Sequence, residues 1–397
     1  MTTVSPSLAE WLDEHGEGLV AVRRHLHAHP ELSGAEHATT ELVEERLRLA
    51  GLEPRRLAVG TGLVCDLAPT TPSGEFEELL ALRADLDALA MTDDKDVSYA
   101  SRHPGVAHAC GHDVHTTIVL GVALYFAHHR DHLPGPVRFV FQPAEERVPG
   151  GALDVISDGG LDGVGAIVGV HCEPKLDVGT IGLRSGAISS AADMAVIRLV
   201  GPGGHTARPE LTVDLVTLAA RIVNELPARV AARLDDPAQV KLVFGAIHAG
   251  DAANVIPTHC ELKASIRTPS LPVWERLPAL VDSEVVSLVG ESGALVEIDY
   301  THGVPPVVND ADVTETVRRA AIDVVGAQSV TTVEQSWGGD DFAWFTREVP
   351  GTYVRLGVRD PSGPTLDLHA GHFDVDERSI ALGVRVLVGA VHEHFRS

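Results

Sequence analysis

The sequence predicts an α/β fold, in which a domain with a mixed, largely buried sheet flanked by helices is interrupted by an α+β two-layer sandwich. Three observations lead to this prediction. Short apolar runs alternate with helical stretches at first, strands typical of an antiparallel sheet follow from about residue 184, and the first pattern returns after about residue 302. We therefore expect domain segments at 1–183, 184–301 and 302–397, since 397 residues suit about two domains.

The first segment begins with helices and continues with strands of a buried sheet. A helical pattern over 6–29 stops at Pro30 and Gly34, and an amphipathic helix over 41–51 closes at Gly51. Continuous apolar runs separated by helices are typical of buried strands. The predicted strands are 62–67, 78–85, 137–143 and 165–171, and the predicted helices between them are 113–129 and 151–158.

The middle segment has the order strand, helix, strand, strand, helix, strand, which describes a small α+β sandwich. The α/β pattern then returns with a helix, a strand and a closing helix. The middle elements include strands at 194–201, 240–250 and 260–268 and helices at 212–230 and 274–290, and the returning elements are 311–326, 352–358 and 379–395.

Composition excludes several classes of protein. A net charge of −25 argues against binding nucleic acid, because such proteins are normally basic. No apolar run approaches the roughly 18 residues that a membrane helix needs, and the N-terminus lacks an apolar signal core. Four scattered cysteines favour a reducing compartment. We expect a cytoplasmic protein.

Polar clusters lie at the ends of several predicted strands. Ligand sites in α/β sheets form outside the carboxyl ends of the strands, so clusters that are distant in sequence can meet there. A further cluster, in the sequence HACGHD, lies in a loop just before a helix. The clusters that follow strands are Asp85 with Asp87, Glu145 with Glu146, His171, and His369.

Five of these side chains are typical ligands of transition metals. They are one thiol, one carboxylate and three imidazoles, a set that suits Zn²⁺, Mn²⁺, Co²⁺ or Ni²⁺ better than Mg²⁺ or Ca²⁺. Five ligands are more than one closed tetrahedral site uses, and they suit two ions that share a bridging ligand. The five residues are Cys110, His112, Glu146, His171 and His369.

Glu145 has a different expected task. Two adjacent carboxylates cannot both easily bind one ion from an extended backbone, so Glu145 is the candidate general base for a metal-activated water. Each feature alone has an ordinary explanation. A single histidine after a strand can simply be a hydrogen-bonded core residue, and the pair Glu145–Glu146 can begin a helix, where the dipole favours acids. The whole set is hard to explain by packing.

The chain also resembles a known family, the M20 metallopeptidases, and specifically their amidohydrolase branch of N-acyl-amino-acid, hippurate and auxin-conjugate hydrolases. The resemblance covers nearly the whole chain and runs in the order of the family. It rests on RRHLHAHPELSGAE, ALRADLDALAM, HACGHDVHTTIVLG, VFQPAEE, VGVHCEP, GGHTARP, GDAANVIP, SIRT, SWGGDDFAWF and LHAGHFDVDERS.

The resemblance implies a two-metal catalytic domain and an inserted lid domain through which the protein forms a homodimer. Cys110 would bridge the two ions, and His112, Glu146, His171 and His369 would complete their coordination. His205 would reach the active site of the partner subunit and donate a hydrogen bond to the developing oxyanion. Asn254 and Arg267 would bind the substrate, and Asp85 and Asp87 would support the ligands without binding metal.

The residues and the resemblance together predict a metal-dependent amidohydrolase. Its substrate would be an N-acyl amino acid or a small peptide-like conjugate with a free carboxylate. A dipeptidase or aminoacylase activity at the same site is the close alternative. A non-catalytic metal-stabilised binding protein, or a thiol redox protein that uses Cys110, are alternatives of other classes.

Overall fold

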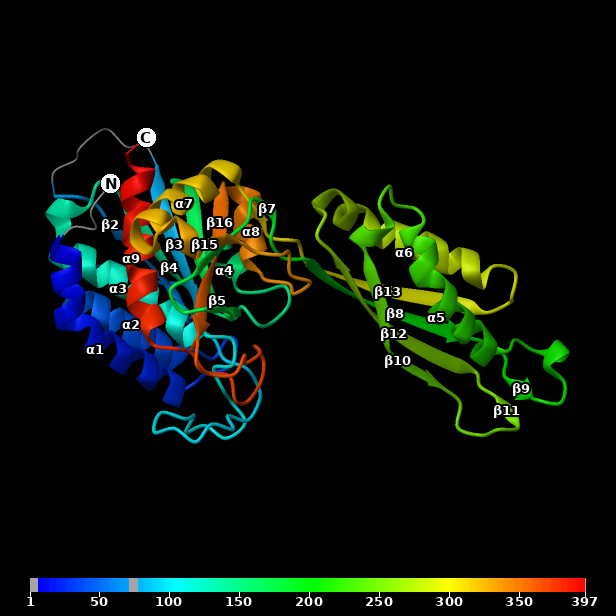
Figure 1. Ribbon diagram of the computed structural model, residues 1–397. Coiled ribbons are helices and arrows are strands. Elements are labelled where there is room, and N and C mark those ends of the chain that lie inside the picture. Colours follow the sequence, from blue (N-terminus) through cyan, green and yellow to red (C-terminus); the bar gives the residue numbers. More distant parts are fainter. Residues whose placement is uncertain (1–5, 71–77, 397) are drawn as a thin grey trace. The chain divides into compact units, whose positions relative to one another are not determined.

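The computed structural model describes residues 6–70 and 78–396, which belong to two compact units (Figure 1). The first unit comprises Met1–Ile188, Val308–Glu334 and Asp341–Ser397, and the second comprises Ser189–Val307 and Gln335–Asp340. The second unit is thus an insertion that takes one further short segment from late in the chain.

An eight-stranded mixed sheet forms the centre of the first unit, in the order β1-β2-β4-β3-β5-β16-β6-β15. The pairs β3–β4, β3–β5, β5–β16 and β6–β15 are parallel, and the remaining pairs are antiparallel. This confirms the predicted fold class. The strands of this unit are β1 Arg55–Arg56, β2 Leu63–Leu67, β3 Leu79–Asp85, β4 Val137–Gln142, β5 Val164–Asp177, β6 Ile181–Leu183, β7 Gly186–Ala187, β14 Val308–Asn309, β15 Val330–Thr332 and β16 Gly351–Arg359.

Helices cover this sheet. Helices α1, α3 and α9 pack side by side, and α3 and α9 lie against the central strands (Figure 1). Alternate residues of the strands, among them Leu82, Val168 and Leu356, join these helices in the main core. The helices of this unit are α1 Pro6–Ala28, α2 His37–Leu49, α3 His112–His128, α4 Ala152–Ser157, α7 Ala311–Val325, α8 Phe342–Glu348 and α9 Arg378–His394.

Helix α2 begins four residues before its predicted start at 41. The reason is a cap that comes from outside the helix. The Glu31 carboxylate accepts hydrogen bonds from the backbone N–H groups of Ala38 and Thr39 at 3.1 and 2.8 Å. Glu31 thereby satisfies two of the N–H groups that have no partner within the helix. Neither position 36 nor position 37 carries a typical N-cap residue, so the sequence gives no signal for a helix start there.

The second unit is a four-stranded antiparallel sheet, in the order β10-β12-β8-β13, with helices α5 and α6 on one face (Figure 1). Inward residues such as Ile197, Leu262 and Val285 form its own core. The opposite face of the sheet carries exposed side chains, including Met194 and Val243. The elements are β8 Ala191–Val200, β9 Gly204–His205, β10 Lys241–Ala249, β11 Val255–Ile256, β12 His259–Thr268, β13 Leu295–Val304, α5 Leu215–Ala231 and α6 Leu271–Val289.

Sequence signals explain the helix starts of this unit. Asp214 accepts hydrogen bonds from the N–H groups of Val216 and Thr217 at the start of α5. Ser270 caps α6 in the same way, with a proline in the first turn. Short 3₁₀ helices elsewhere in the chain cover Arg130–His132, Pro209–Leu211, Pro237–Gln239 and Ala327–Ser329. Within the described residues, no helix is both long enough and apolar enough to cross a membrane.

Candidate metal centre

The predicted ligands of the first unit meet in one place. Ligand atoms of Cys110, Glu146 and His369 all lie within 4.8 Å of one another. Nε2 of His171 lies 3.5 Å from Sγ of Cys110, and Nε2 of His369 lies 3.3 Å from Oε1 of Glu146. Four residues from four separate parts of the chain therefore surround one small space.

His112 and Glu145 belong to the same cluster. Their ligand atoms and those of Glu146 also lie within 4.8 Å of one another. Nε2 of His112 is 3.8 Å from Oε1 of Glu146 and 3.9 Å from Oε2 of Glu145. The arrangement brings together all five predicted ligands and the predicted base.

Two of the imidazoles are oriented by backbone carbonyl groups. Nδ1 of His112 lies 2.9 Å from the carbonyl oxygen of Asp87, and Nδ1 of His171 lies 2.7 Å from that of Cys172. A carbonyl only accepts hydrogen bonds, so in the neutral form of each ring Nδ1 carries the proton and the lone pair of Nε2 faces the cluster. Orientation of this kind is usual for histidines that bind metals.

The donor set fits a metal for a further reason. Nε2 of His112 and Oε1 of Glu146 are buried, and neither makes a well-directed hydrogen bond among residues 6–70 and 78–396, although Nε2 of His369 lies 3.3 Å from Oε1 of Glu146. Buried polar atoms without partners are costly, and a divalent cation between them would satisfy both. Sulfur, nitrogen and oxygen donors in this ratio suit zinc, manganese, cobalt or nickel.

The backbone is strained at two points of the cluster. Ala144 and His369 have φ angles of 54° and 56°, and among the described residues no other non-glycine residue has a positive φ. Such a conformation costs about 1–3 kcal/mol and persists where the surroundings enforce it, often at functional sites. The turn at Ala144 directs Glu145 and Glu146 into the cluster directly after β4.

Glu36 holds this turn in place. Its Oε1 accepts the N–H of Ala144 at 2.8 Å and that of Gly34 at 2.7 Å. Burial raises the pKa of the Glu36 carboxyl group, and the two hydrogen bonds oppose this effect. Glu36 thus ties the loop after α1 to the loop that carries the glutamate pair.

Asp87 lies behind the predicted ligands. Its Oδ2 accepts hydrogen bonds from the N–H of Glu146 at 2.9 Å and from Oγ of Ser33 at 2.6 Å, and its Oδ1 is 3.3 Å from Nδ1 of His112. Asp87 therefore positions one predicted histidine ligand and one predicted carboxylate ligand together.

Asp85 is bound mainly to two buried residues that the sequence did not single out. His115 lies 2.7 Å from its Oδ1, and Arg83 forms an ion pair with its Oδ2. Arg83 also pairs with Asp341 at 3.0 Å and donates to Gln142 at 2.7 Å. These residues form a polar layer in which the positive charge of Arg83 compensates two buried carboxylates.

Burial and neighbouring charges shift the pKa values of the cluster. Burial raises the pKa of the Cys110 thiol well above its usual range, with a further contribution from Glu146. Burial lowers the pKa of His171 well below its usual range. For His112 burial also opposes the charged form, but Asp85 and Cys110 prevail and raise its pKa well above the usual value. A divalent cation bound here would favour neutral imidazoles and would convert the thiol to a thiolate.

The structure corrects two details of the predicted strands. His171 does not follow the end of a strand, because β5 continues to Asp177 and pairs with β16 on both sides of this position. His369 does not directly follow a strand either, since β16 ends at Arg359. His369 lies in a loop between β16 and α9, and this loop returns to the cluster, where the N–H of His369 donates to the carbonyl of Ala109 at 2.8 Å.

The remaining predicted residues belong to the second unit. His205 lies in β9 and is paired with Val255 of β11, directly after Asn254, and both His205 and Asn254 are exposed. Nδ1 of His205 accepts the N–H of Ala207 at 3.0 Å, so the neutral ring carries its proton on Nε2. Arg267 lies near the end of β12, on the face of the sheet opposite the helices.

Sequence reasoning missed Glu36, Arg83 and His115. All three lie within the motifs on which the resemblance rests, and Arg83 and His115 lie two and three positions from the candidates Asp85 and His112, which is the signal that the sequence offers. Their partners come from other parts of the chain, so only the fold shows what they do.

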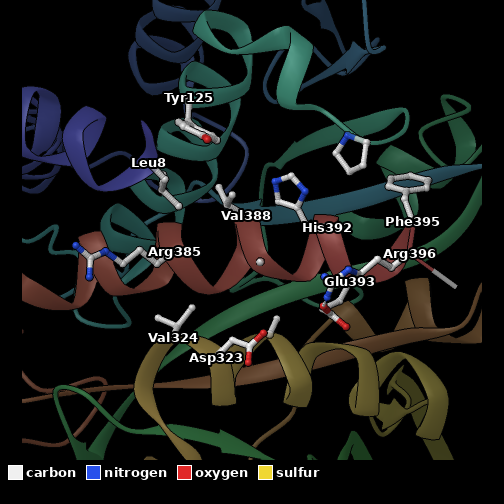
Figure 2. A pocket seen from close by; sticks show the side chains of 13 residues that line it. Leu8, Tyr125, Asp323, Val324, Arg385, Val388, His392, Glu393, Phe395 and Arg396 are labelled. Atoms are coloured by element: carbon white, nitrogen blue, oxygen red, sulfur yellow. Dashed lines mark hydrogen bonds and ion pairs between the residues drawn. The ribbon is translucent and has the colours of Figure 1, made fainter. Parts of the chain in front are cut away.

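A separate cavity of about 250 Å³ lies between α1, α3, α7 and α9 (Figure 2). Its walls combine apolar side chains such as Leu8, Val388 and Phe395 with the polar side chains of His392 and Arg385. None of the predicted site residues lines it. It is a feature of the helical layer and not part of the metal cluster.

Known proteins resemble this chain over most of its length. A family model described as peptidase family M20/M25/M40 matches residues 81–393. An N-acyl-L-amino acid amidohydrolase from Geobacillus stearothermophilus is 36% identical over 298 residues, which cover 75% of this chain and 80% of that protein.

A solved structure shows the same fold. The YxeP protein of Bacillus subtilis, described as a dinuclear metal-binding peptidase of the M20 family, superimposes with a TM-score of 0.83 at 29% identity and covers 96% of this chain and 98% of that one. A longer relative from Rhodococcus jostii, which carries the name of a glutamate–cysteine ligase, is 45% identical over 377 residues. The match covers 95% of this chain but 46% of that protein. About half of the longer protein therefore has no counterpart in this chain, and its name describes the whole of it.

Proposed function

The chain belongs to peptidase family M20/M25/M40, and we propose that it is a metal-dependent amidohydrolase of N-acyl amino acids or similar small conjugates with a free carboxylate. The observation that carries the proposal is the meeting of Cys110, Glu146 and three histidines in one cluster, where Glu145 lies beside His112 and Glu146. The amidohydrolase and peptidase names of the relatives support the general class of reaction.

Cys110, His112, Glu146, His171 and His369 would hold two divalent ions, and the resemblance implies that Cys110 would be the shared ligand. When bound, the ions would polarise water and the substrate carbonyl, as metals do in hydrolases. The name of the Bacillus subtilis protein supports a pair of ions. The donors are compatible with zinc, manganese, cobalt or nickel.

Glu145 acts as the general base in this proposal. Its carboxylate shares the cluster with His112 and Glu146, at a distance where it can reach a water molecule held there. It takes a proton from the attacking water and later returns it to the leaving amine. Proton transfer by a positioned side chain contributes about 10²–10⁴-fold to a rate.

Residues of the second unit complete the site in this proposal. The proton on Nε2 makes His205 a hydrogen-bond donor, which suits stabilisation of an oxyanion. Asn254 and Arg267 bind the substrate, and the planar guanidinium of Arg267 suits a carboxylate. As the resemblance implies, His205 acts on a second copy of the chain in a homodimer. The four cysteines are all free and buried, which supports the cytoplasm as the compartment.

The test combines metal analysis with a substrate panel. Purified protein should contain about two divalent ions per chain and should hydrolyse N-acetyl or N-benzoyl amino acids. Glu145→Gln should keep the metals and lose nearly all turnover. Glu146→Gln is the matched control, because it alters the neighbouring carboxylate and should lower the metal content itself. Normal turnover by Glu145→Gln would refute the mechanism.

The same panel separates the close alternative. Aminoacyl amino acids carry a free amine where acyl amino acids have none. If the aminoacyl compounds alone are hydrolysed, the protein is a dipeptidase and the proposed substrate class is wrong.

A further inference from the structure

Two cations lie directly opposite each other on the open face of the sheet in the second unit. Lys241 begins β10, and in the antiparallel pairing it is the partner of Arg267 on β12. Side chains at directly opposite positions have Cβ atoms about 4.5–5.5 Å apart, and like charges in such a pair destabilise the sheet. The chain has a net charge of −25 and four lysines, so this pairing is not a consequence of abundant basic residues.

The segment Gln335–Asp340 lies beside both cations. The ammonium group of Lys241 lies 3.8 Å from the ring centroid of Trp337, a cation–π contact. Gly339 lies against Ala192 and Arg267, where a Cβ atom would come 2.7 Å from Cβ of Ala192 and 3.4 Å from Nη1 of Arg267. This segment therefore contacts Lys241 through Trp337 and approaches Arg267 through Gly339, and Nε of Arg267 donates to Oγ of Ser265 at 3.3 Å.

The protein does not neutralise this pair. Within residues 6–70 and 78–396, no carboxylate forms an ion pair with Lys241 or Arg267. Burial lowers the pKa of Arg267, and Asp193 opposes this effect without an ion-pair contact. Other arginines of the same sheet do have acidic partners, as Arg198 has in Glu261 and Asp299. An anion from outside would remove the repulsion between the two cations.

We propose that Lys241 and Arg267 form a subsite for two carboxylates of one substrate, so that the enzyme prefers N-acyl derivatives of acidic amino acids. This inference rests on the proposed function and names its substrate class. Arg267 offers a planar fork for the α-carboxylate, and Lys241 offers a point charge for the side-chain carboxylate. Beside them, Met194 and Val243 flank Ser265 on the same face and provide apolar contact for methylene groups.

A pair of nearly identical substrates tests the subsite. N-acetyl-L-glutamate and N-acetyl-L-glutamine have the same shape and differ in one carboxylate. We expect the metal-loaded wild type to favour the glutamate compound by about tenfold in kcat/KM, mainly through KM, as suits one partly desolvated charged hydrogen bond. Lys241→Met removes the charge but keeps a long unbranched side chain beside Trp337, and it should bring this ratio close to one.

Lys263→Met is the matched control. Lys263 lies on the same face of β12 but is paired with Glu261 at 3.2 Å, so this variant should keep the wild-type ratio. A wild type without preference, or a Lys241→Met variant that keeps it, would overturn the inference and leave the proposed function standing.

Direct binding separates the two proposals. Calorimetric titration with glutarate, a dicarboxylate, and with butyrate, a monocarboxylate, needs no turnover. Wild type and Lys263→Met should bind glutarate about tenfold more tightly than Lys241→Met does, and butyrate should show a smaller difference. If no N-acyl amino acid is hydrolysed, the proposed function fails, and the glutarate titration alone decides whether the subsite exists. Equal glutarate affinity in all three proteins would refute it.

Discussion

Nδ1 of His115 lies 2.7 Å from Oδ1 of Asp85, and Nε2 of the same ring accepts the N–H of Cys172 at 2.8 Å. The amide of Cys172 can only donate, so Nε2 holds a lone pair and Nδ1 donates its proton to Asp85. The carbonyl of Cys172 in turn accepts the Nδ1–H of His171. His115 therefore fixes the backbone that orients one of the proposed metal ligands.

This relationship predicts a loss of metal affinity in His115→Asn. The asparagine amide can still donate to Asp85 but is too short to reach the amide of Cys172. Loss of such outer contacts typically weakens metal binding about 10–100-fold. Chelator competition should show this loss, whereas kcat at saturating metal should change much less. His129→Asn, just beyond the other end of α3, is the control. Unchanged metal affinity in His115→Asn would contradict the positioning role.

Helix and strand positions in the fold were largely predictable from the sequence. Helix α3 was predicted at 113–129 and found at His112–His128, because a long apolar stretch lies between glycine and polar boundaries. Strands of two or three residues, such as β6 and β7, carry too little pattern to be predicted. The extension of β5 to Asp177 depends on pairing with β16, and such pairing is a tertiary effect.

The metal-binding side chains of the site were predictable from the sequence, and the residues that position them were not. Cys110, His112 and Glu146 stand out because metal-binding side chains are grouped around predicted strand ends, and the structure brings them together. Their role as ligands stays a prediction. Glu36 and His115 could not be assigned, because the residues that they contact lie 108 and 57 positions away in sequence.

Mixing two inactive variants tests the proposed homodimer. Glu145→Gln lacks the base and His205→Ala lacks the oxyanion donor, so each alone should have little activity. If His205 serves a second copy of the chain, a mixed dimer contains one intact site. Random exchange should then restore about a quarter of wild-type activity, since half of the dimers are mixed and have one of two sites intact. Recovery should require subunit exchange, and its absence in proven mixed dimers would contradict a shared site.

Two glycines of α9 should respond to alanine in opposite ways. In Gly383→Ala the new Cβ would meet Cγ1 of Ile118 at 2.9 Å and its Cδ1 more closely still, and overpacking of this kind costs about 1–3 kcal/mol. In Gly389→Ala the nearest atom is Cβ of Ala320 at 3.3 Å, and the residue borders the cavity of Figure 2, which leaves room to adjust.

Alanine within a helix is favoured over glycine by up to about 1 kcal/mol. Gly389→Ala should therefore raise the midpoint of thermal unfolding by about 1–2 °C, because the shift per kcal/mol is small in a chain of 397 residues, and Gly383→Ala should lower it. Differential scanning calorimetry measures both. A shift in the same direction for the two variants would show that the close contact with Ile118 does not control packing between α3 and α9.

His392 predicts how stability depends on pH. It lines the cavity of Figure 2, and burial lowers its pKa below the usual 6.5, with further contributions from the nearby His132 and Arg396. A base with a lowered pKa in the folded state binds fewer protons there than in the unfolded chain. The free energy of unfolding must then fall as the pH drops below 6.5, because the unfolded state gains protons first.

Replacing His392 with leucine should remove part of this acid sensitivity. One such group changes the free energy of unfolding by at most about 1.4 kcal/mol per pH unit, and its partial exposure reduces this to roughly half. Urea unfolding of the wild type and His392→Leu at pH 7 and pH 5 measures the difference in slope. His37→Asn, at an exposed position on α2, is the control and should follow the wild type. If the free energy of unfolding falls between pH 7 and pH 5 by as much in His392→Leu as in the wild type, groups other than His392 cause the acid sensitivity.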